Sequence, residues 1–270
     1  ANLHGVDVEL VTGSLLDRDL VTSLTQQAQA VVHLAALPSV PRSIADPVSS
    51  WDVNATGTLN ILEGARATGA HVVYASSSSV YGSAPQLPKH EELPTWPLSP
   101  YAASKLAGEA LVLAYGRSYR LPVLPFRFFN VYGPGQPAGH AYAAVIPTFL
   151  DCALRGLPLP VYGDGEQSRD FTYVGTVVEV IAQALAQQVI SEEPVNLAFG
   201  SRATLLELIA EIAEQLGHEL AVLHQPPRPG DIRHSQAANA RLRRLFPDVA
   251  PVPLRSGLTE TLRWFREAGR

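Results

Sequence analysis

The feature that most constrains the fold is an alternation of short apolar runs with segments of helix length. The runs are rich in β-branched residues, which suits strands that are buried on both faces of a parallel sheet. The predicted strands are 6–13 (VDVELVTG), 30–37 (AVVHLAAL), 71–77 (HVVYASS) and 121–129 (LPVLPFRFF), and the predicted helices among them cover 51–68 and 100–119. Strand, helix and strand in repetition predict an α/β fold with a doubly wound parallel sheet.

The regular alternation loosens after residues 130–136 (NVYGPGQ). Proline and glycine are scattered among shorter elements from there on, and helices are predicted at 144–155, 173–187 and 203–216. The proline-rich segment 223–231 (LHQPPRPGD) predicts a rigid binding loop. We therefore expect a larger domain over 1–136 and a smaller lobe over 137–270 that is interleaved with the last strands of the sheet.

Length and charge exclude several classes of protein. A chain of 270 residues with a net charge of -5 and a pI of about 5.9 has room for a sizeable core. The net negative charge disfavours nucleic-acid binding as the main task, although a local arginine pocket could hold a small anion. No apolar run approaches the ~20 residues of a membrane-spanning helix, and the single cysteine, Cys152, excludes an internal disulfide. We expect a cytoplasmic protein that binds neither nucleic acid nor membrane and holds no metal.

Polar side chains gather where two predicted elements meet one edge of the sheet. Four serines at 76–79 end a predicted strand, and Tyr101 and Lys105 lie four residues apart on a predicted helix. Ligands of doubly wound sheets bind beyond the carboxyl ends of the strands. A lysine ammonium one helical turn away favours the phenolate of a tyrosine, and a serine hydroxyl could share the proton of an alcohol. Ser77, Tyr101 and Lys105 thus fit alcohol-ketone interconversion, although tyrosine and lysine four apart also occur by chance in most proteins.

Six motifs then follow one another in an order that resembles a known superfamily. They are VVHLAAL (31–37), VNATGTLNILEGA (53–65), YASSSSVYG (74–82), SPYAASKLAGE (99–109), FRFFNVYGPGQ (126–136) and GDGEQSRDFTYV (163–174). The set resembles the extended short-chain dehydrogenases/reductases, above all their nucleotide-sugar 4-epimerases. The resemblance runs from about residue 6 to residue 265, which is nearly the whole chain.

The resemblance implies a Rossmann-like cofactor and catalytic domain over 1–136, with NAD as cofactor, and a lobe over 137–270 that binds a UDP-sugar. By resemblance Tyr101 is the catalytic base, Lys105 binds the nicotinamide ribose and lowers the pKa of the tyrosine, and Ser77 hydrogen-bonds the sugar 4-hydroxyl. The implied reaction oxidises C4 to a transient 4-keto sugar and returns the hydride to its other face. Such a reaction epimerises UDP-glucose and UDP-galactose. Capping of the strand end is the alternative role for the serines.

The resemblance also implies ligand contacts residue by residue. The implied cofactor contacts are Ser14, Leu15, Leu34, Ala35, Ala36, Asn54, Ala75, Ser76, Tyr101, Lys105 and Phe129. The implied substrate contacts are Ser39, Ser77, Ser78, Asn130, Ala144, Val145, Arg169, Arg228, Asp231 and Ser235. Arg169 and Arg228 match two diphosphate-binding arginines, whose planar guanidinium groups suit phosphate oxygens. Ser235 stands where epimerases limited to glucose and galactose often carry tyrosine, so a small side chain here leaves room for an N-acetyl group.

The sequence departs from this family at its start. The family opens with a strand, a G-x-x-G-x-x-G turn and a helix whose amides hold the NAD pyrophosphate, and the sequence contains no such turn. We expect that roughly 50 residues of the usual βαβ start are absent, so that residue 1 falls just before the third strand. Either the chain is a fragment of a full epimerase, or it is a naturally shortened protein with lost or modified NAD binding.

Two other functions stay open on the sequence. One is another nucleotide-sugar enzyme, such as a UDP-glucuronate epimerase or decarboxylase. A 4,6-dehydratase is disfavoured, because Ser78 and Ser79 stand where those enzymes carry Asp-Glu. The other is a catalytically silent sugar-nucleotide-binding protein with an incomplete NAD site.

The resemblance further implies a homodimer. Helices 51–68 and 100–119 match those that pair across a two-fold axis in the family. Apolar residues such as Leu111 and Leu113 could instead belong to the core of one chain.

Overall fold

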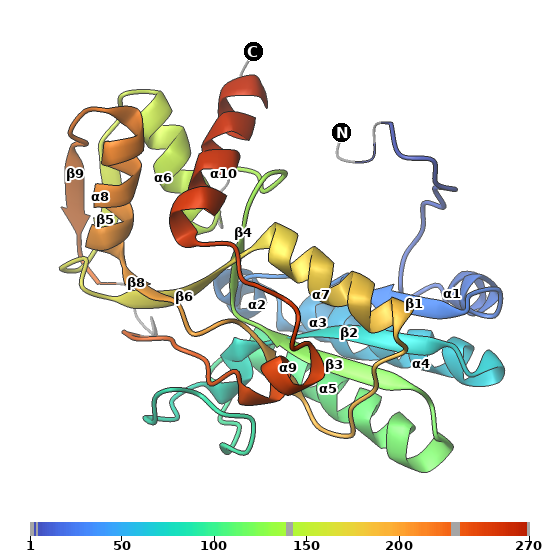
Figure 1. The fold of residues 1–270 in the computed structure, drawn as a ribbon. Helices are drawn as coiled ribbons and strands as arrows, with labels where there is room; N and C mark the ends of the chain where they lie inside the picture. The colour runs from blue at the N-terminus through green and yellow to red at the C-terminus, as the bar shows by residue number, and fades with distance from the viewer. Residues whose placement is uncertain (1–2, 4, 139–142, 228–232, 269–270) are drawn as a thin grey trace.

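A four-stranded parallel sheet lies at the centre of the computed structural model, which describes residues 3, 5–138, 143–227 and 233–268 (Figure 1). In spatial order its strands are β1 (Ala30–His33), β2 (His71–Ser77), β3 (Val123–Phe128) and β7 (Val195–Leu197). Each neighbouring pair is parallel, and Ser77 pairs with Phe128 where β2 and β3 end. The carboxyl ends of the strands therefore meet at one edge, where ligands of such sheets bind.

Helices cover both faces of this sheet. Val72 of β2 packs with α4 and α5 on one face, and its neighbour Val73 packs with α7 and α9 on the other. Successive residues of a strand point to opposite faces, so β2 is buried on both sides. The helices are α4 (Gly57–Thr68), α5 (Pro100–Tyr119), α7 (Val174–Ala186) and α9 (Ala240–Leu245). The predicted α/β fold with a doubly wound parallel sheet is confirmed.

Local sequence signals mark the start of helix α5 and the end of helix α4. Helix α5 covers the predicted range 100–119, and it begins with Ser99 as N-cap, whose side chain accepts a hydrogen bond from the amide of Ala102. The helix predicted over 51–68 consists of α3 (Pro47–Trp51), the π-helical segment η1 (Asp52–Thr56) and α4, without a break between them. It ends at Gly69, whose φ of 72° is left-handed. π-Helical turns inside helices are frequent at functional sites.

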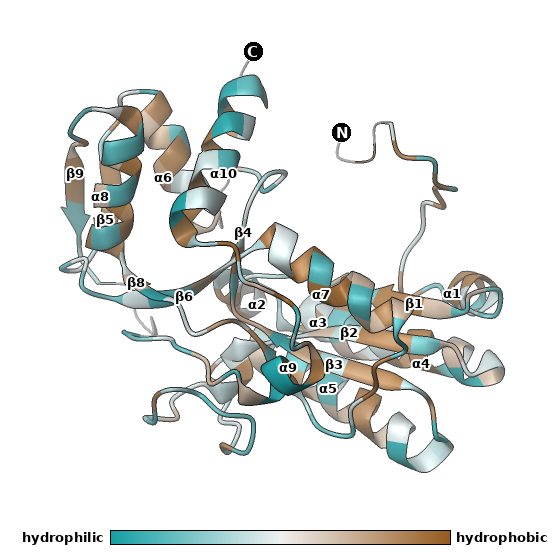
Figure 2. Cartoon of the chain, viewed as in Figure 1, coloured by the Kyte–Doolittle hydropathy of each residue, from teal (hydrophilic) through white to brown (hydrophobic). Residues whose placement is uncertain are grey.

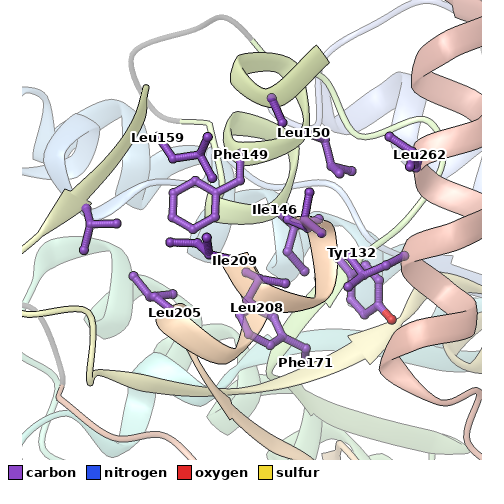
Figure 3. Close-up of a cluster of buried hydrophobic side chains, with 14 residues drawn as sticks. Tyr132, Ile146, Phe149, Leu150, Leu159, Phe171, Leu205, Leu208, Ile209 and Leu262 are labelled. Carbon is purple, nitrogen blue, oxygen red and sulfur yellow. The ribbon is translucent and has the colours of Figure 1, made fainter. Parts of the chain in front are cut away.

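A second group of elements follows β3 along the chain. One small sheet contains β4 (Asn130–Tyr132), β6 (Ser168–Tyr173) and β8 (Arg202–Thr204), and another pairs β5 (Leu159–Tyr162) with β9 (Val222–Gln225). Helices α6 (Val145–Leu154), α8 (Leu205–Leu216) and α10 (Leu254–Ala268) pack with them. Figure 3 shows their shared core, which includes Phe149, Leu208 and Leu262. The predicted helices at 144–155 and 203–216 match α6 and α8, and 173–187 matches α7.

The chain crosses between the two groups. Strand β7 and helix α7 both lie beyond residue 136 in the sequence. Strand β7 belongs to the main sheet, and α7 packs against one face of it. The lobe is thus interleaved with the sheet, and the domain boundary at residue 136 stays a prediction. The segment 223–231, predicted as a binding loop, starts inside strand β9, and its residues 228–231 lie outside the described part of the chain.

Residues 6–13 do not form a strand, so that prediction is wrong. The chain is irregular there until α1 (Arg18–Thr25), and Val6, Val8 and Leu10 are 54%, 52% and 70% exposed. A strand needs a neighbour that satisfies its backbone hydrogen bonds. Among the described residues no strand pairs with this segment, and Figure 1 shows it leading away from the sheet. A β-branched pattern alone therefore does not make a strand here.

The distribution of hydropathy follows these layers. Figure 2 shows apolar colours on the central strands β2 and β3 and also on helices α6 and α7. Within the described ranges, no helix combines the length and the apolar character that crossing a membrane requires. The same residues contain no group of side chains suited to hold a metal ion.

Candidate active site

Ser77 stands at the last position of β2 and begins the 3-10 turn η2 (Ser78–Tyr81). Its side chain accepts a hydrogen bond from the amide of Ser79 at 3.2 Å, and the two hydroxyls are 2.8 Å apart. The serine therefore does cap the turn, as the alternative role predicts. The capping also fixes its hydroxyl at the carboxyl edge of the sheet, where Ser77 is only half-buried.

Helix α5 places Tyr101 and Lys105 one turn apart near its N-terminus. Burial raises the pKa of Tyr101, and a hydrogen bond with the Ser77 hydroxyl opposes this rise. Lys105 is 2% exposed, and burial lowers its pKa to about 8. Its Nζ lies 4.5 Å from the ring centroid of Tyr74 on β2. The Ser77 hydroxyl thus meets Tyr101 at the strand end, and Lys105 lies one helical turn further along the same helix.

His33 lies under this cluster as a neutral side chain. Burial lowers its pKa to about 3, with the charge of Lys105 contributing in the same direction. Its Nε2 is 2.9 Å from the hydroxyl of Thr58, which donates to the backbone carbonyl of Asn54 at 2.7 Å. The hydroxyl proton is used in that bond, so His33 donates from Nε2. Its part here is structural.

The predicted cofactor contacts fall into two groups. Leu34 and Ala35 follow β1 and are exposed, whereas Ala75, Ser76 and Phe129 are buried at the ends of β2 and β3. Ser14 and Leu15 lie far along the chain from both groups. The Leu15 carbonyl accepts a bond from Asn60, and Ser14 is exposed.

The side chain of Asn54, in η1, makes its hydrogen bonds to other residues of the protein. Its Oδ1 accepts from the amide of Leu37 at 2.7 Å, and its Nδ2 donates to the carbonyl of Leu37 at 3.2 Å and to the Ser104 hydroxyl at 3.0 Å. Asn54 therefore ties the segment after β1 to helix α5. It shapes the predicted cofactor side of the site through these contacts.

A cavity of about 570 Å³ opens beyond the end of β3, between β4, β5, β6 and α6. Its size is that of a small-molecule site. Five predicted ligand residues line it together: Phe129, Asn130, Ala144, Val145 and Arg169. The cavity thus begins at the residue after Phe128, which pairs with Ser77.

The cavity wall also contains polar residues that the sequence motifs do not identify as ligands. Among them are Gln136, Tyr162 and Gln167. Gln167 donates to the carbonyl of Tyr162 at 2.6 Å, which holds the end of β5 in place. Gln136 and Gln167 lie within two of the motifs matched above, and this location was the sequence signal that could have identified them as cavity residues.

The other predicted substrate residues lie outside this lining. Ser39 caps helix α2 (Val40–Ala45) with a φ of 94°, and Ser78 starts η2. The amide of Ser235 donates to the carbonyl of Ser168 at 3.0 Å, beside Arg169. Arg228 and Asp231 lie outside the described residues.

Comparison with known proteins places the chain among nucleotide-sugar enzymes. Residues 1–198 match the model of the NAD dependent epimerase/dehydratase family. The chain is 35% identical over 272 residues to the UDP-glucose 4-epimerase of Mycolicibacterium smegmatis, covering 98% of this chain and 86% of that protein. Other relatives are named UDP-glucuronate 4-epimerase and dTDP-glucose 4,6-dehydratase.

Solved structures agree with these matches. The UDP-N-acetylglucosamine 4-epimerase from Methanobrevibacter ruminantium, in complex with UDP-N-acetylmuramic acid, superposes with a TM-score of 0.92 at 33% identity, covering 98% of this chain and 85% of that one. The UDP-glucose 4-epimerase of Thermus thermophilus in complex with NAD gives a TM-score of 0.84 at 36% identity, with coverages of 95% and 84%. The family match, the relatives and the solved structures thus all assign the chain to the NAD dependent epimerase/dehydratase family.

Proposed function

Because this chain belongs to the NAD dependent epimerase/dehydratase family, we propose that it epimerises a UDP-hexose at C4. Its relatives are UDP-sugar 4-epimerases and other nucleotide-sugar-modifying enzymes, so an enzyme of this general kind is established. The finer proposal is supported by the hydrogen bond between Ser77 and Tyr101, with the buried Lys105 one helical turn away. Ser77 pairs with Phe128, and the cavity lined by Asn130 and Arg169 begins at the next residue.

NAD is the cofactor of this family, and residues at the strand ends fit its nicotinamide side. When bound, NAD supplies a carbon that accepts and returns a hydride. Lys105 would hold the adjoining ribose, with Phe129, Ala75 and the exposed Leu34 and Ala35 as apolar surface. The fit rests on the buried ammonium next to an apolar strand edge.

The proton chemistry belongs to the side chains of this chain. The Tyr101 phenolate would take the proton of the sugar 4-hydroxyl, while the Ser77 hydroxyl orients that oxygen. The buried Lys105 ammonium stabilises the phenolate, because an opposite charge nearby favours the charged form. On return of the hydride, Tyr101 would give the proton back to the same oxygen.

The substrate would lie with its diphosphate towards Arg169 and Asn130. A guanidinium meets phosphate oxygens with paired donors. Arg169 is oriented by two neighbouring backbone carbonyls, since its Nη1 donates to Ser168 at 3.0 Å and to Arg233 at 3.4 Å. Arg228 and Asp231 are proposed as further contacts of the diphosphate and the nucleotide ribose, on the resemblance alone.

The proposal favours epimerisation over dehydration. Elimination of water needs an additional acid and base, and the two residues after Ser77 are serines. The Ser79 hydroxyl is already engaged with Ser77 at 2.8 Å. Ser235, with its small side chain, supports acceptance of an N-acetylhexosamine pair as well as glucose and galactose.

We also propose a homodimer. A surface groove is lined by Pro47, Val48, Trp51, Asp52, Pro100 and Ala103. Val48 and Trp51 are 68% and 48% exposed, and their helix continues into the segment predicted to pair between subunits. Leu111 packs against the core of its own chain. Light scattering would show a dimer mass for the wild type and a monomer mass for Trp51→Glu.

Two assays test the proposed activity. Denaturation of the purified protein should release NAD, detected by its reduction with a dehydrogenase. UDP-galactose and UDP-N-acetylgalactosamine should then each be converted to the gluco isomer. UDP binding without NAD and without conversion would instead identify a silent binding protein. The single cysteine keeps the cytoplasm as the proposed location.

A further inference from the structure

A buried network of polar side chains joins α5 to β2 and β3. Its centre is the ion pair of Glu109 on α5 with Arg127 on β3, whose Nη2 lies 2.7 Å from Oε1 and whose Nε lies 3.0 Å from Oε2. Ser76, the neighbour of Ser77, donates its hydroxyl to Oε2 at 2.6 Å. Ser76, Glu109 and Arg127 are 3%, 2% and 4% exposed. Two strands therefore hold one carboxylate of the helix.

The network continues from Arg127 to the substrate lobe. The guanidinium lies 4.7 Å from the ring centroid of Tyr81, whose hydroxyl donates to Oδ1 of Asn196 at 2.6 Å. Asn196 in turn donates to the backbone carbonyl of Ala238 at 3.2 Å. Ala238 lies three residues after Ser235, a proposed sugar contact. These contacts connect α5 with the segment that contains Ser235.

Close packing fixes α5 against β2 at the same level. A Cβ at Gly108 would lie 2.2 Å from the hydroxyl oxygen of Tyr74, so only hydrogen fits between helix and strand there. The Tyr74 hydroxyl donates to the backbone carbonyl of Lys105 at 3.3 Å. Tyr101, Lys105 and Glu109 follow at intervals of four and share one face of the helix. A shift at Glu109 is therefore passed to both other residues.

We propose that Glu109 is a positioning residue for the catalytic helix. Arg127 and Ser76 hold its carboxylate, which fixes the position of α5 along its axis and so the positions of Tyr101 and Lys105 relative to Ser77. The same carboxylate keeps Lys105 as an ammonium. The proposal rests on the epimerase function proposed above. It adds to that function a residue that acts through Lys105 and not on the sugar.

The surroundings of Lys105 leave Glu109 as the group that favours its charge. Burial lowers the pKa of Lys105, and Glu109 opposes this. His33 on β1 is neutral, and Tyr74 on β2 presents its ring face. The other charged or titratable groups on elements that pack against α5 are Arg42 on α2, Asp52 on η1, Glu63 and Arg66 on α4, His71 on β2, Tyr81 on η2 and Arg127 on β3.

The titration of Lys105 can be followed directly. The sequence contains two lysines, Lys89 and Lys105, so carbon-13 labelling of lysine gives two Cε signals in an NMR titration of the full chain. In Glu109→Gln we expect the Lys105 midpoint to fall by about one unit or more, while Lys89 keeps its midpoint. The alkaline limb of the kcat profile should move down with it. kcat should fall about tenfold or more, with KM nearly unchanged.

Two further variants separate this role from a purely structural one. Glu109→Leu/Arg127→Met removes both charges, and apolar replacement of a buried pair is often neutral for stability, so it guards against unfolding of the single variant. It should show the same lowered Lys105 midpoint. Arg241→Gln is the matched control, because it breaks a buried guanidinium's pairs with Glu92 and Glu193 on other elements. Its two lysine midpoints should equal those of the wild type.

Unchanged Lys105 midpoints and kcat profiles in the folded Glu109 variants would overturn the proposal. Failure of the wild type to convert any UDP-sugar would overturn the epimerase function instead. The NMR titration would still decide whether Glu109 sets the charge of Lys105, because it needs no turnover.

Discussion

The proposed catalytic edge of the main sheet and the proposed substrate lobe differ in how their buried polar groups are paired. Behind Ser77, the charges of Glu109 and Arg127 satisfy each other inside the core. Around the cavity, Oε1 of Gln136, Oδ1 of Asp170 and Oγ1 of Thr172 are buried without a hydrogen-bond partner among the described residues. In the main sheet the same holds for the two ring nitrogens of His71, which stands at the opposite end of β2 from Ser77. The fold itself thus holds the catalytic side chains in place, as preorganised sites require. Of the unpartnered groups around the cavity, the Asp170 carboxyl has a pKa that burial raises to about 6, so its charge depends on pH.

This difference predicts the kind of effect that substitutions have in each region. A change at the catalytic edge should remove chemistry from a molecule that is otherwise intact. A change in the lobe should alter affinity, selectivity or the pH dependence of stability. The following substitutions test that division.

Tyr101→Phe should have the largest effect. It removes the proposed base, so kcat for UDP-galactose should fall by about 10²–10⁴-fold, while the thermal midpoint stays near that of the wild type. Tyr115→Phe is a control on the same helix, where the lost hydroxyl donates to Glu63. Equal activity of Tyr101→Phe and wild type would remove Tyr101 from the mechanism and break the comparison.

Asp170→Asn should change how stability depends on pH. Burial raises the pKa of Asp170 from 3.8 to about 6, against the hydrogen bond that Oδ2 accepts from the amide of Ala237 at 3.0 Å. A raised folded pKa gives stability that is complete below pH 3.8 and lost as the pH rises through 6. The wild type should therefore lose up to about 3 kcal/mol relative to Asp170→Asn between pH 4 and pH 7.

Urea unfolding of both proteins across this range would measure that difference. Asp164→Asn serves as the control, because this carboxylate is exposed and pairs with Arg233 on the surface. A difference between wild type and Asp170→Asn that stays constant with pH would show that the buried carboxyl does not titrate there.

Arg169→Ala should weaken binding more than chemistry. Loss of a charge-assisted contact to the diphosphate should raise KM by about 10–100-fold, which corresponds to roughly 1.5–3 kcal/mol, with a smaller change in kcat. Calorimetric binding of UDP would check the same loss. Arg155→Ala, which removes an exposed arginine paired with Asp151, should leave both values unchanged. A fall in kcat alone would place Arg169 with the catalytic region.

Ser235→Tyr should have the smallest effect, and one confined to selectivity. A bulky ring should lower kcat/KM for UDP-N-acetylgalactosamine by about tenfold or more and leave that for UDP-galactose within a fewfold. Ser235→Ala provides the small-residue control. Unchanged activity of Ser235→Tyr towards the acetamido sugar would refute the steric argument.

Local signals explain where sequence and structure agree. The range 71–77 forms β2 and 100–119 forms α5, because an apolar run and the Ser99-Pro100 start specify these elements without distant help. The segment 6–13 has an equally good strand pattern and is irregular. Its outcome depends on a neighbouring strand, and a local pattern carries no information about that.

The site shows the same limit. The motifs identify Ser77, Tyr101 and Lys105, and α5 and β2 bring them together. They do not identify the pairing of Glu109 with Arg127, since it depends on how α5 packs on β3. The sequence signals for this ion pair were a charged residue, Arg127, within the apolar run FRFF and a charged residue, Glu109, one helical turn beyond Lys105. A buried ion pair can only be assigned once both elements are placed in space.

The π-helical segment η1 makes the structure sensitive to the number of residues between α3 and α4. Each residue of an α-helix turns by about 100°, so deletion of one residue within 52–56 would regularise the helix and rotate everything before it by about that angle relative to α4. Asn54 would lose its hold on Leu37 and Ser104, and Trp51 would leave its groove beside Pro100. An insertion or deletion of one codon in this segment would therefore displace both the contacts of Asn54 and the groove beside Trp51.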